Sequence, residues 1–132
     1  MDLEELMRRH PYVFEIRPGA SMLSCDPGWM AIYDRLFTDF EDELLQDPAS
    51  LRRFRLRQTK EKFGGMRVYY TFEEPDRVPE DLRTRLCELT RQAEQQSMKT
   101  CQHCGQPGEL RTFGGWFATL CARHAKQVSV ED

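Results

Sequence analysis

The sequence has no hydrophobic run of the roughly 20 residues that a helix needs to cross a bilayer, so we do not expect a transmembrane protein. Its first six residues, MDLEEL, are acidic and amphipathic, and they lack the basic start and apolar core of a secretory signal. We therefore expect a cytoplasmic protein. A strong excess of one charge is also missing: 19 basic and 22 acidic side chains give a formal net charge of −3, unlike a histone-like binder.

Motifs of the common enzyme classes are absent as well. The chain has no Ser-His-Asp signature, no phosphate-cradling glycine loop and no His-Glu-x-x-His helix. A zinc deaminase would need His-x-Glu ahead of Pro-Cys-x-x-Cys, and neither element is present. The nearest enzymatic alternative is a treble-clef nuclease, whose catalytic and metal-binding histidines would have to be His103 and His124. We therefore expect a binding protein and not an enzyme.

What the sequence does contain is a concentrated set of metal-ligand residues near its end. Cys101 and Cys104 form one pair, and Cys121 and His124 form a second pair with the same two-residue spacing. In a reducing compartment such cysteines bind metal more often than they form disulfides. Three thiolates and one imidazole suit a closed, tetrahedral Zn²⁺ site, so we predict a structural zinc ion. His103 is the alternative fourth ligand, although it lies inside the turn of the first pair.

Hydrophobic periodicity predicts three helices and a hairpin ahead of this site. The helices are a short one that ends at His10-Pro11, a long one that Asp26 caps and Pro27 begins and that ends near residue 46, and one from Pro79 to about Ser97. Period-two alternation on both sides of Gly64-Gly65 predicts a β-hairpin within residues 51–72. Residues 11–16 are expected to be extended.

These elements predict an α+β fold, with helices packed on a β-hairpin or small antiparallel sheet over residues 1–98. Residues 99–132 are too few to fold without a cross-link or a bound metal ion, so we expect them to be a zinc-finger module packed on that body. In this module a cysteine pair is followed by a hairpin around Gly114-Gly115, and the second ligand pair then begins a helix over residues 121–128. This order is typical of a treble clef. Trp29 and Trp116 are expected in the core, the latter over the zinc hairpin. Cys25 and Cys87 are expected to be small buried hydrophobic residues.

Charge is segregated along the body. Basic residues gather in and beside the hairpin, at Arg52, Arg53, Arg55, Arg57, Lys60, Lys62 and Arg67. Acidic residues gather on the long helix, at Asp39, Glu41, Asp42 and Glu43. The basic set could bind a phosphate backbone, and the acidic set could mimic nucleic acid, but each could also be a solvated face or balance the other.

Several segments together resemble a family of small zinc-finger proteins encoded by tailed phages, prophages and some bacteria. The resemblance rests on KEKFGGMRVYY at residues 60–70, on CQHCGQPG at residues 101–108, on the Gly114-Gly115-Trp116 turn and on CARHA at residues 121–125. CDPGW at residues 25–29 is similar to the family's Cys-Gly-Asp-Gly-Trp element, from which Asp26-Pro27 departs. The resemblance implies zinc at Cys101, Cys104, Cys121 and His124, and it implies no activity or substrate.

The leading hypothesis is therefore a zinc-containing protein of phage type that binds a protein partner. By that contact it would inhibit or redirect a host machine, such as a nucleic-acid-handling or defence complex. The alternatives are a nucleic-acid-binding protein that uses the basic hairpin and, second, the metal-dependent nuclease.

Overall fold

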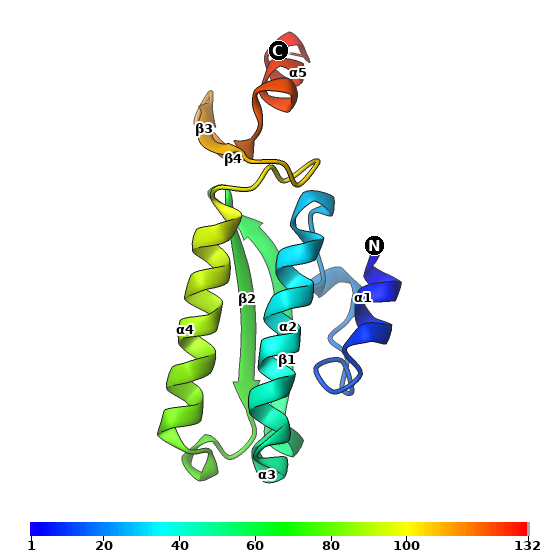
Figure 1. Cartoon of the computed structure of the whole chain (residues 1–132), viewed down its shortest axis with the longest axis vertical. Helices are drawn as coiled ribbons and strands as arrows, with labels where there is room; N and C mark the ends of the chain where they lie inside the picture. Colours follow the sequence, from blue (N-terminus) through cyan, green and yellow to red (C-terminus); the bar gives the residue numbers. More distant parts are fainter. Residues whose placement is uncertain (132) are drawn as a thin grey trace.

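The computed structural model describes residues 1–131 of the chain, and it confirms a fold that mixes helices with small antiparallel sheets. In chain order the helices and strands are α1 (Leu3–Arg9), α2 (Met30–Leu45), α3 (Pro48–Arg53), β1 (Phe54–Lys62), β2 (Gly65–Phe72), α4 (Glu80–Ser97), β3 (Glu109–Phe113), β4 (Trp116–Leu120) and α5 (Ala122–Glu131). Short 3-10 turns occur at Ala20–Met22, Pro27–Trp29 and Pro75–Arg77. Figure 1 shows α2 and α4 side by side along the β1–β2 hairpin, with β3, β4 and α5 at one end of this body. No helix in residues 1–131 is both long and apolar enough to span a membrane.

The core of the body lies between α2, α4 and the hairpin. Apolar residues recur on α2 at helical spacing, and four of them are completely buried: Tyr33, Phe37, Phe40 and Leu44. The ring of Phe40 packs edge-on against the rings of Phe54 on β1 and Tyr70 on β2, with centroids 5.9 and 5.3 Å away. Trp29, also completely buried, joins the same core from the turn before α2.

Both ends of α2 differ in detail from the prediction. Pro27 begins a 3-10 turn that runs into the helix, but the carboxylate of Asp26 does not cap it. Instead Asp26 accepts a hydrogen bond from the amide of Gln102, 76 residues away. At the other end, Asp47-Pro48 stops α2 and also starts α3. The side chain of Asp47 caps α3 because it accepts a hydrogen bond from the backbone amide of Ser50. The prediction that residues 51–53 belong to the hairpin is therefore wrong.

The hairpin turn lies one residue earlier than predicted. Lys62 pairs with Gly65, so the two turn residues are Phe63 and Gly64, with φ of 55° and 80°. Positive φ at both positions is the geometry of a type I′ turn, which favours asparagine and glycine. Gly65 is instead the first residue of β2, where it is buried near Met98.

The N-terminal segment packs on the side of α2. Helix α1 forms as predicted and ends before His10. Residues 11–16 form turns, so the prediction of an extended segment is wrong. The amide of Phe14 donates to the carbonyl of His10, and the ring of Phe14 meets Phe37 edge-on. The segment therefore folds back because its apolar side chains reach the core.

Candidate metal centre

Four ligand side chains converge at the C-terminal end of the molecule. The sulfur atoms of Cys101, Cys104 and Cys121 and a ring nitrogen of His124 all lie within 4.8 Å of one another; we call these residues the Cys3His cluster. The Cys104 and Cys121 sulfurs are 3.8 Å apart, and Nδ1 of His124 lies 3.6 Å from the Cys101 sulfur and 3.2 Å from that of Cys121. A tetrahedral zinc ion, with Zn–S bonds of about 2.3 Å and Zn–N bonds of about 2.0 Å, separates its ligand atoms by roughly 3.5–3.8 Å. The donor set therefore fits such an ion.

The local backbone explains how each pair of ligands faces one point. Between the first two ligands the chain turns tightly: the amide of Gly105 donates to the carbonyl of Cys101, and Gly105 adopts a φ of 81°. The positive φ favours glycine because it has no Cβ. Cys121 directly precedes α5, and the amide of Ala125 donates to its carbonyl, so His124 lies in the first turn of that helix.

The protein environment favours the metal-binding protonation states of Cys101 and His124 but not that of Cys104. Burial alone would raise the pKa of Cys101, but hydrogen bonds from the backbone of Cys121, Cys104 and His103 outweigh it and lower the pKa to about 7. Burial, together with the charges of His103 and Arg123, lowers the pKa of His124. A backbone hydrogen bond from Gln106 alone would lower the pKa of Cys104, but burial and the neighbouring thiols of Cys101 and Cys121 outweigh it and raise that pKa. Thiolate and neutral imidazole are the forms that ligate zinc.

His124 completes the cluster, and His103 does not belong to it. The ring of His103 is exposed and lies edge-on to the ring of His124, with centroids 4.5 Å apart. Of the two alternatives that the sequence left open, the structure brings His124 and not His103 into the group that could hold a metal ion.

The module has only a small apolar core beside the cluster. Its buried residues are Cys101, Ala118, Leu120 and Ala125. Trp116 is not among them: its side chain is 51 % exposed and stacks on Phe113 at the end of the β3–β4 hairpin. The prediction that Trp116 is a core residue is therefore wrong, whereas the same prediction for Trp29 is confirmed.

The turn of the first cysteine pair lies directly on the body. The amide of Gly28 donates to the carbonyl of Gln102 at 2.8 Å, and the indole of Trp29 donates to the carbonyl of Thr100 at 2.9 Å. A Cβ atom on Gly28 would lie only 1.9 Å from the carbonyl oxygen of Cys101. Glycine is therefore required at residue 28 for the metal-binding turn to approach the start of α2.

A second contact joins the two hairpins. The hydroxyl of Thr119 on β4 donates to the carbonyl of Gly64 in the β1–β2 turn, 2.7 Å away, and both groups are buried. The amide of Thr119 in turn donates to the side chain of Gln102. The module is thus fixed to the body at α2 and at the hairpin tip.

The remaining cysteines lie away from the cluster. Cys25 is half-buried beside Thr59, and burial raises the pKa of its thiol. Cys87 is exposed on α4, so the prediction that it is buried is wrong.

The seven basic candidates do not form one free surface. Arg55 and Arg57 approach Glu73, and Arg67 pairs with Glu94 on α4. Arg52 and Arg53 belong to α3 and not to the hairpin, and Nε of Arg53 is buried without a hydrogen-bond partner. On the hairpin, Lys60 and Lys62 remain without a carboxylate partner among the side chains that the structure describes, those of residues 1–128; each lies over an aromatic ring.

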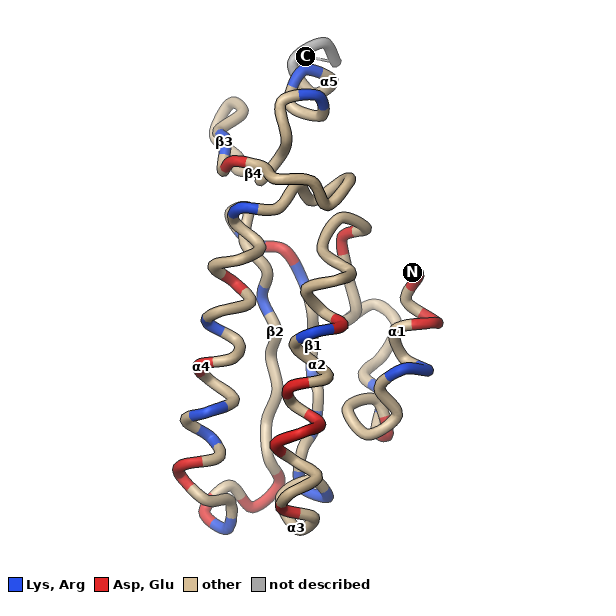
Figure 2. The backbone as a smooth tube through the Cα atoms, viewed as in Figure 1, with Lys and Arg blue, Asp and Glu red and all other residues tan. Residues whose placement is uncertain are grey.

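The acidic candidates are also distributed among different partners. Figure 2 shows the acidic residues along α2. Asp39 pairs with Arg35, Glu43 pairs with Arg85 on α4, and Asp42 is exposed. Glu41 is only 9 % exposed, so it does not belong to a solvated acidic face.

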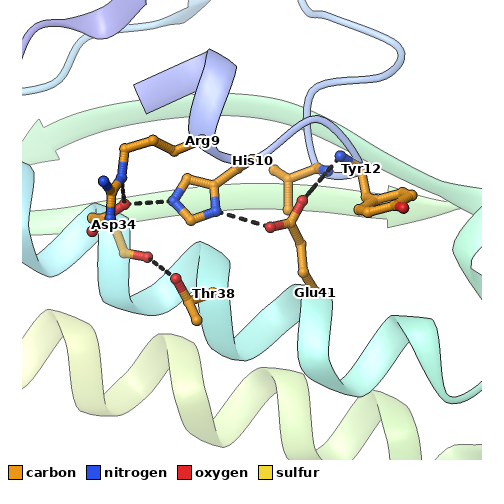
Figure 3. Close-up of polar contacts among 7 residues, drawn as sticks. Arg9, His10, Tyr12, Asp34, Thr38 and Glu41 are labelled. Atoms are coloured by element: carbon orange, nitrogen blue, oxygen red, sulfur yellow. Dashed lines mark hydrogen bonds and ion pairs between the residues drawn. The ribbon is translucent and has the colours of Figure 1, made fainter. Parts of the chain in front are cut away.

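Glu41 instead belongs to a buried network around His10 that sequence reasoning missed (Figure 3). His10 Nδ1 lies 2.9 Å from Glu41 and Nε2 lies 2.6 Å from Asp34. Arg9 also donates to Asp34 through two nitrogens, and Glu41 accepts from the backbone amide of Tyr12. Carboxylates only accept hydrogen bonds, so both ring nitrogens of His10 must carry protons for both contacts to form. A buried, charged histidine therefore holds the N-terminal segment on α2.

Within residues 1–131, the Cys3His cluster is the group of His, Cys, Asp and Glu side chains that could hold a metal ion. Comparisons of the chain with protein-family models, with curated proteins and with solved structures find no match. The donor atoms of the cluster, three sulfurs and one imidazole nitrogen, are therefore the best guide to function.

Proposed function

We propose that the chain is a zinc-binding protein that acts by binding a macromolecule, with the zinc ion in a structural role. The observation that carries this proposal is the Cys3His cluster, whose separations fit a tetrahedral ion. Four protein ligands fill the coordination sphere of such an ion, whereas a catalytic zinc keeps one position open for water or substrate.

A structural role also agrees with the size of the module. Four small or medium residues form its buried core, and a core of this size cannot stabilise more than 30 residues by itself. An ion bound by the cluster would tie the first cysteine pair to the start of α5 across the β3–β4 hairpin. The order of turn, hairpin and helix around the ion supports a treble-clef-like finger as our proposal for this module.

The proposed target is a host nucleic-acid-handling or defence complex, which the protein would inhibit or redirect by contact. The support for this part is the resemblance of the KEKFGGMRVYY and cysteine motifs to phage zinc-finger proteins. The exposed aromatic residue Trp116, at the end of the β3–β4 hairpin, offers contact area of the kind found at protein-binding surfaces.

The first test is the metal content and local stability of the purified full chain. We expect one zinc ion per chain, and we expect His124→Ala to lower zinc affinity while His103→Ala, its matched control, retains the ion. Hydrogen exchange after chelation should increase strongly over residues 101–128 and much less in α2 and α4, because the ion orders the module. Wild-type protein without zinc, or zinc lost from His103→Ala but kept by His124→Ala, would contradict the proposal.

A further inference from the structure

Phe63 occupies a position that its side chain does not suit. It is the first residue of the type I′ turn between β1 and β2, with a φ of 55°, and its side chain is 62 % exposed. Asparagine or glycine fits this backbone with less strain. An exposed phenylalanine also contributes little to the core. Neither the turn geometry nor packing in the core therefore accounts for a phenylalanine at residue 63. Backbone strain from a positive φ at a residue other than glycine is concentrated at functional positions.

One other exposed ring lies beside Phe63, and a second lies further along the same hairpin. The ring of Phe117, on β4 of the zinc module, meets it edge-on at a centroid distance of 6.1 Å and is 36 % exposed. Tyr69 is 41 % exposed on β2, along the same hairpin. The body and the module thus both contribute aromatic area to the hairpin tip.

Two lysine ammonium groups lie next to these rings. The ammonium group of Lys62 lies 5.6 Å from the centre of the Phe63 ring, and that of Lys60 lies 5.6 Å from the centre of the Tyr69 ring. Neither lysine has a carboxylate partner among the described side chains of residues 1–128. Alternation along β1 places the carboxylate of Glu61 on the opposite face of the strand from the two lysines, where it accepts a hydrogen bond from the amide of Gly64.

We propose that this aromatic–basic surface, formed by Lys60, Lys62, Phe63, Tyr69 and Phe117, binds single-stranded nucleic acid. Aromatic rings that accept stacked bases, combined with cations that neutralise phosphates, are the two elements of sequence-tolerant single-strand binding. Lys60 and Lys62 are two residues apart on a strand, about 6.6 Å, so each can approach a different phosphate of an extended strand. A protein partner fits less well, because lysine is depleted in the cores of protein interfaces.

This inference rests on the proposed function, since Phe117 is held at the surface by the zinc module. The inference also reduces the number of basic residues expected to bind phosphate. Arg55, Arg57 and Arg67 already have carboxylate partners, so the positive charge available for binding is that of Lys60 and Lys62.

Fluorescence anisotropy of zinc-loaded full chain with a labelled oligothymidylate of about 16 nucleotides tests the proposal. We expect binding at low salt that weakens as salt rises, with a shallower salt slope for Lys60→Gln combined with Lys62→Gln. Arg52→Gln, an exposed basic residue on α3, is the matched control and should bind as the wild type does. A duplex of the same length should bind more weakly than the single strand.

Phe63→Asn separates a binding role from a structural one. It creates a better type I′ turn, so the melting temperature should stay the same or rise, while the Kd for the single strand should increase about tenfold or more. If zinc-loaded wild type binds no single strand at low salt, the inference is wrong. The exposed aromatic residues would then be assigned to contact with a protein partner. Unchanged binding by Phe63→Asn overturns the inference as well. Absence of zinc from the protein would instead be a failure of the proposed function.

Discussion

The indole nitrogen of Trp29 donates a hydrogen bond to the carbonyl of Thr100, the residue immediately before the first metal ligand, at 2.9 Å. Trp29 is completely buried in the core of the body, so this bond links that core to the Cys3His cluster. Gly28 makes the adjoining contact with Gln102. Changes at the start of α2 should therefore affect metal binding, although no residue there is a ligand.

Gly28→Ala is the sharpest test of this link. The new methyl group would lie 1.9 Å from the carbonyl oxygen of Cys101 and 2.7 Å from the amide nitrogen of Gly105, and backbone atoms cannot move aside cheaply. We expect a loss of about 3 kcal/mol or more in the free energy of unfolding, measured in urea, and weaker zinc binding in competition with a chelator.

Gly19→Ala is the control for that substitution. Gly19 has a φ of −58°, and nothing lies within 4 Å of the position of its Cβ. Alanine there should leave stability unchanged or raise it by about 0.5 kcal/mol. Equal effects of the two substitutions would show that the contact between Gly28 and the metal-binding turn does not matter.

Trp29→Phe removes the indole donor and part of a buried ring. The carbonyl of Thr100 loses a partner and the core loses volume, so we expect a loss of about 2–4 kcal/mol in thermal or urea unfolding. Trp116→Phe should change stability by less than about 0.5 kcal/mol, because Trp116 is half exposed. A larger loss from Trp116→Phe than from Trp29→Phe would contradict the assignment of the core.

The His10 network predicts a pH dependence of known sign. Burial alone would lower the pKa of His10, but hydrogen bonds to Glu41 and Asp34 outweigh it, so the folded-state pKa is raised. Its contribution to stability is therefore complete below the unfolded-state pKa of about 6.5 and is lost as pH rises through the folded-state value. The Arg9 guanidinium and His10 lower the pKa of Asp34, whose contribution is instead lost in acid, as pH falls through its folded-state value.

His10→Gln tests that dependence when compared with wild type from about pH 5 to about pH 9. The wild type should be more stable by about 3–5 kcal/mol at the acidic end, where the substitution leaves the buried Glu41 without a cation and Asp34 with Arg9 alone, and by less at the alkaline end. Both proteins contain the Cys3His cluster, so its own pH dependence cancels in the difference. A difference that is constant with pH would mean that His10 is not charged in the folded protein.

Thiol alkylation followed by mass spectrometry should distinguish the five cysteines. In zinc-loaded protein we expect fast modification of exposed Cys87 and slow modification of Cys25, which is half-buried and has a raised pKa. Chelation should add three reactive thiols, those of the Cys3His cluster. Rapid modification of Cys104, the most exposed of the three, before chelation would argue against a bound ion.

The elements that sequence could predict are those with a strong local signal. The apolar residues at helical spacing in α2 and the period-two alternation around the hairpin turn predict the correct elements. Both depend only on the period at which hydrophobic residues recur along the sequence. The turn was placed one residue late because Gly64-Gly65 is the better local sequence, whereas the structure puts Phe63 in a strained position. Helix α3 was missed because Asp47-Pro48 both ends one helix and begins the next.

The contacts that sequence could not predict are long-range. His10 meets Asp34 and Glu41, which lie 24 and 31 residues further along the chain. One signal was available: Glu41 is four residues after Phe37 and so falls on the buried stripe of α2, where a carboxylate needs a partner. Trp116 was misplaced because its hairpin end extends past the small core of the module.

X-ray absorption at the zinc K edge of the purified full chain tests the central claim most directly. The account predicts a four-coordinate ion with three sulfur ligands at about 2.3 Å and one nitrogen ligand at about 2.0 Å. An oxygen ligand in place of one of these, or a protein that carries no zinc, would contradict a closed site formed by Cys101, Cys104, Cys121 and His124.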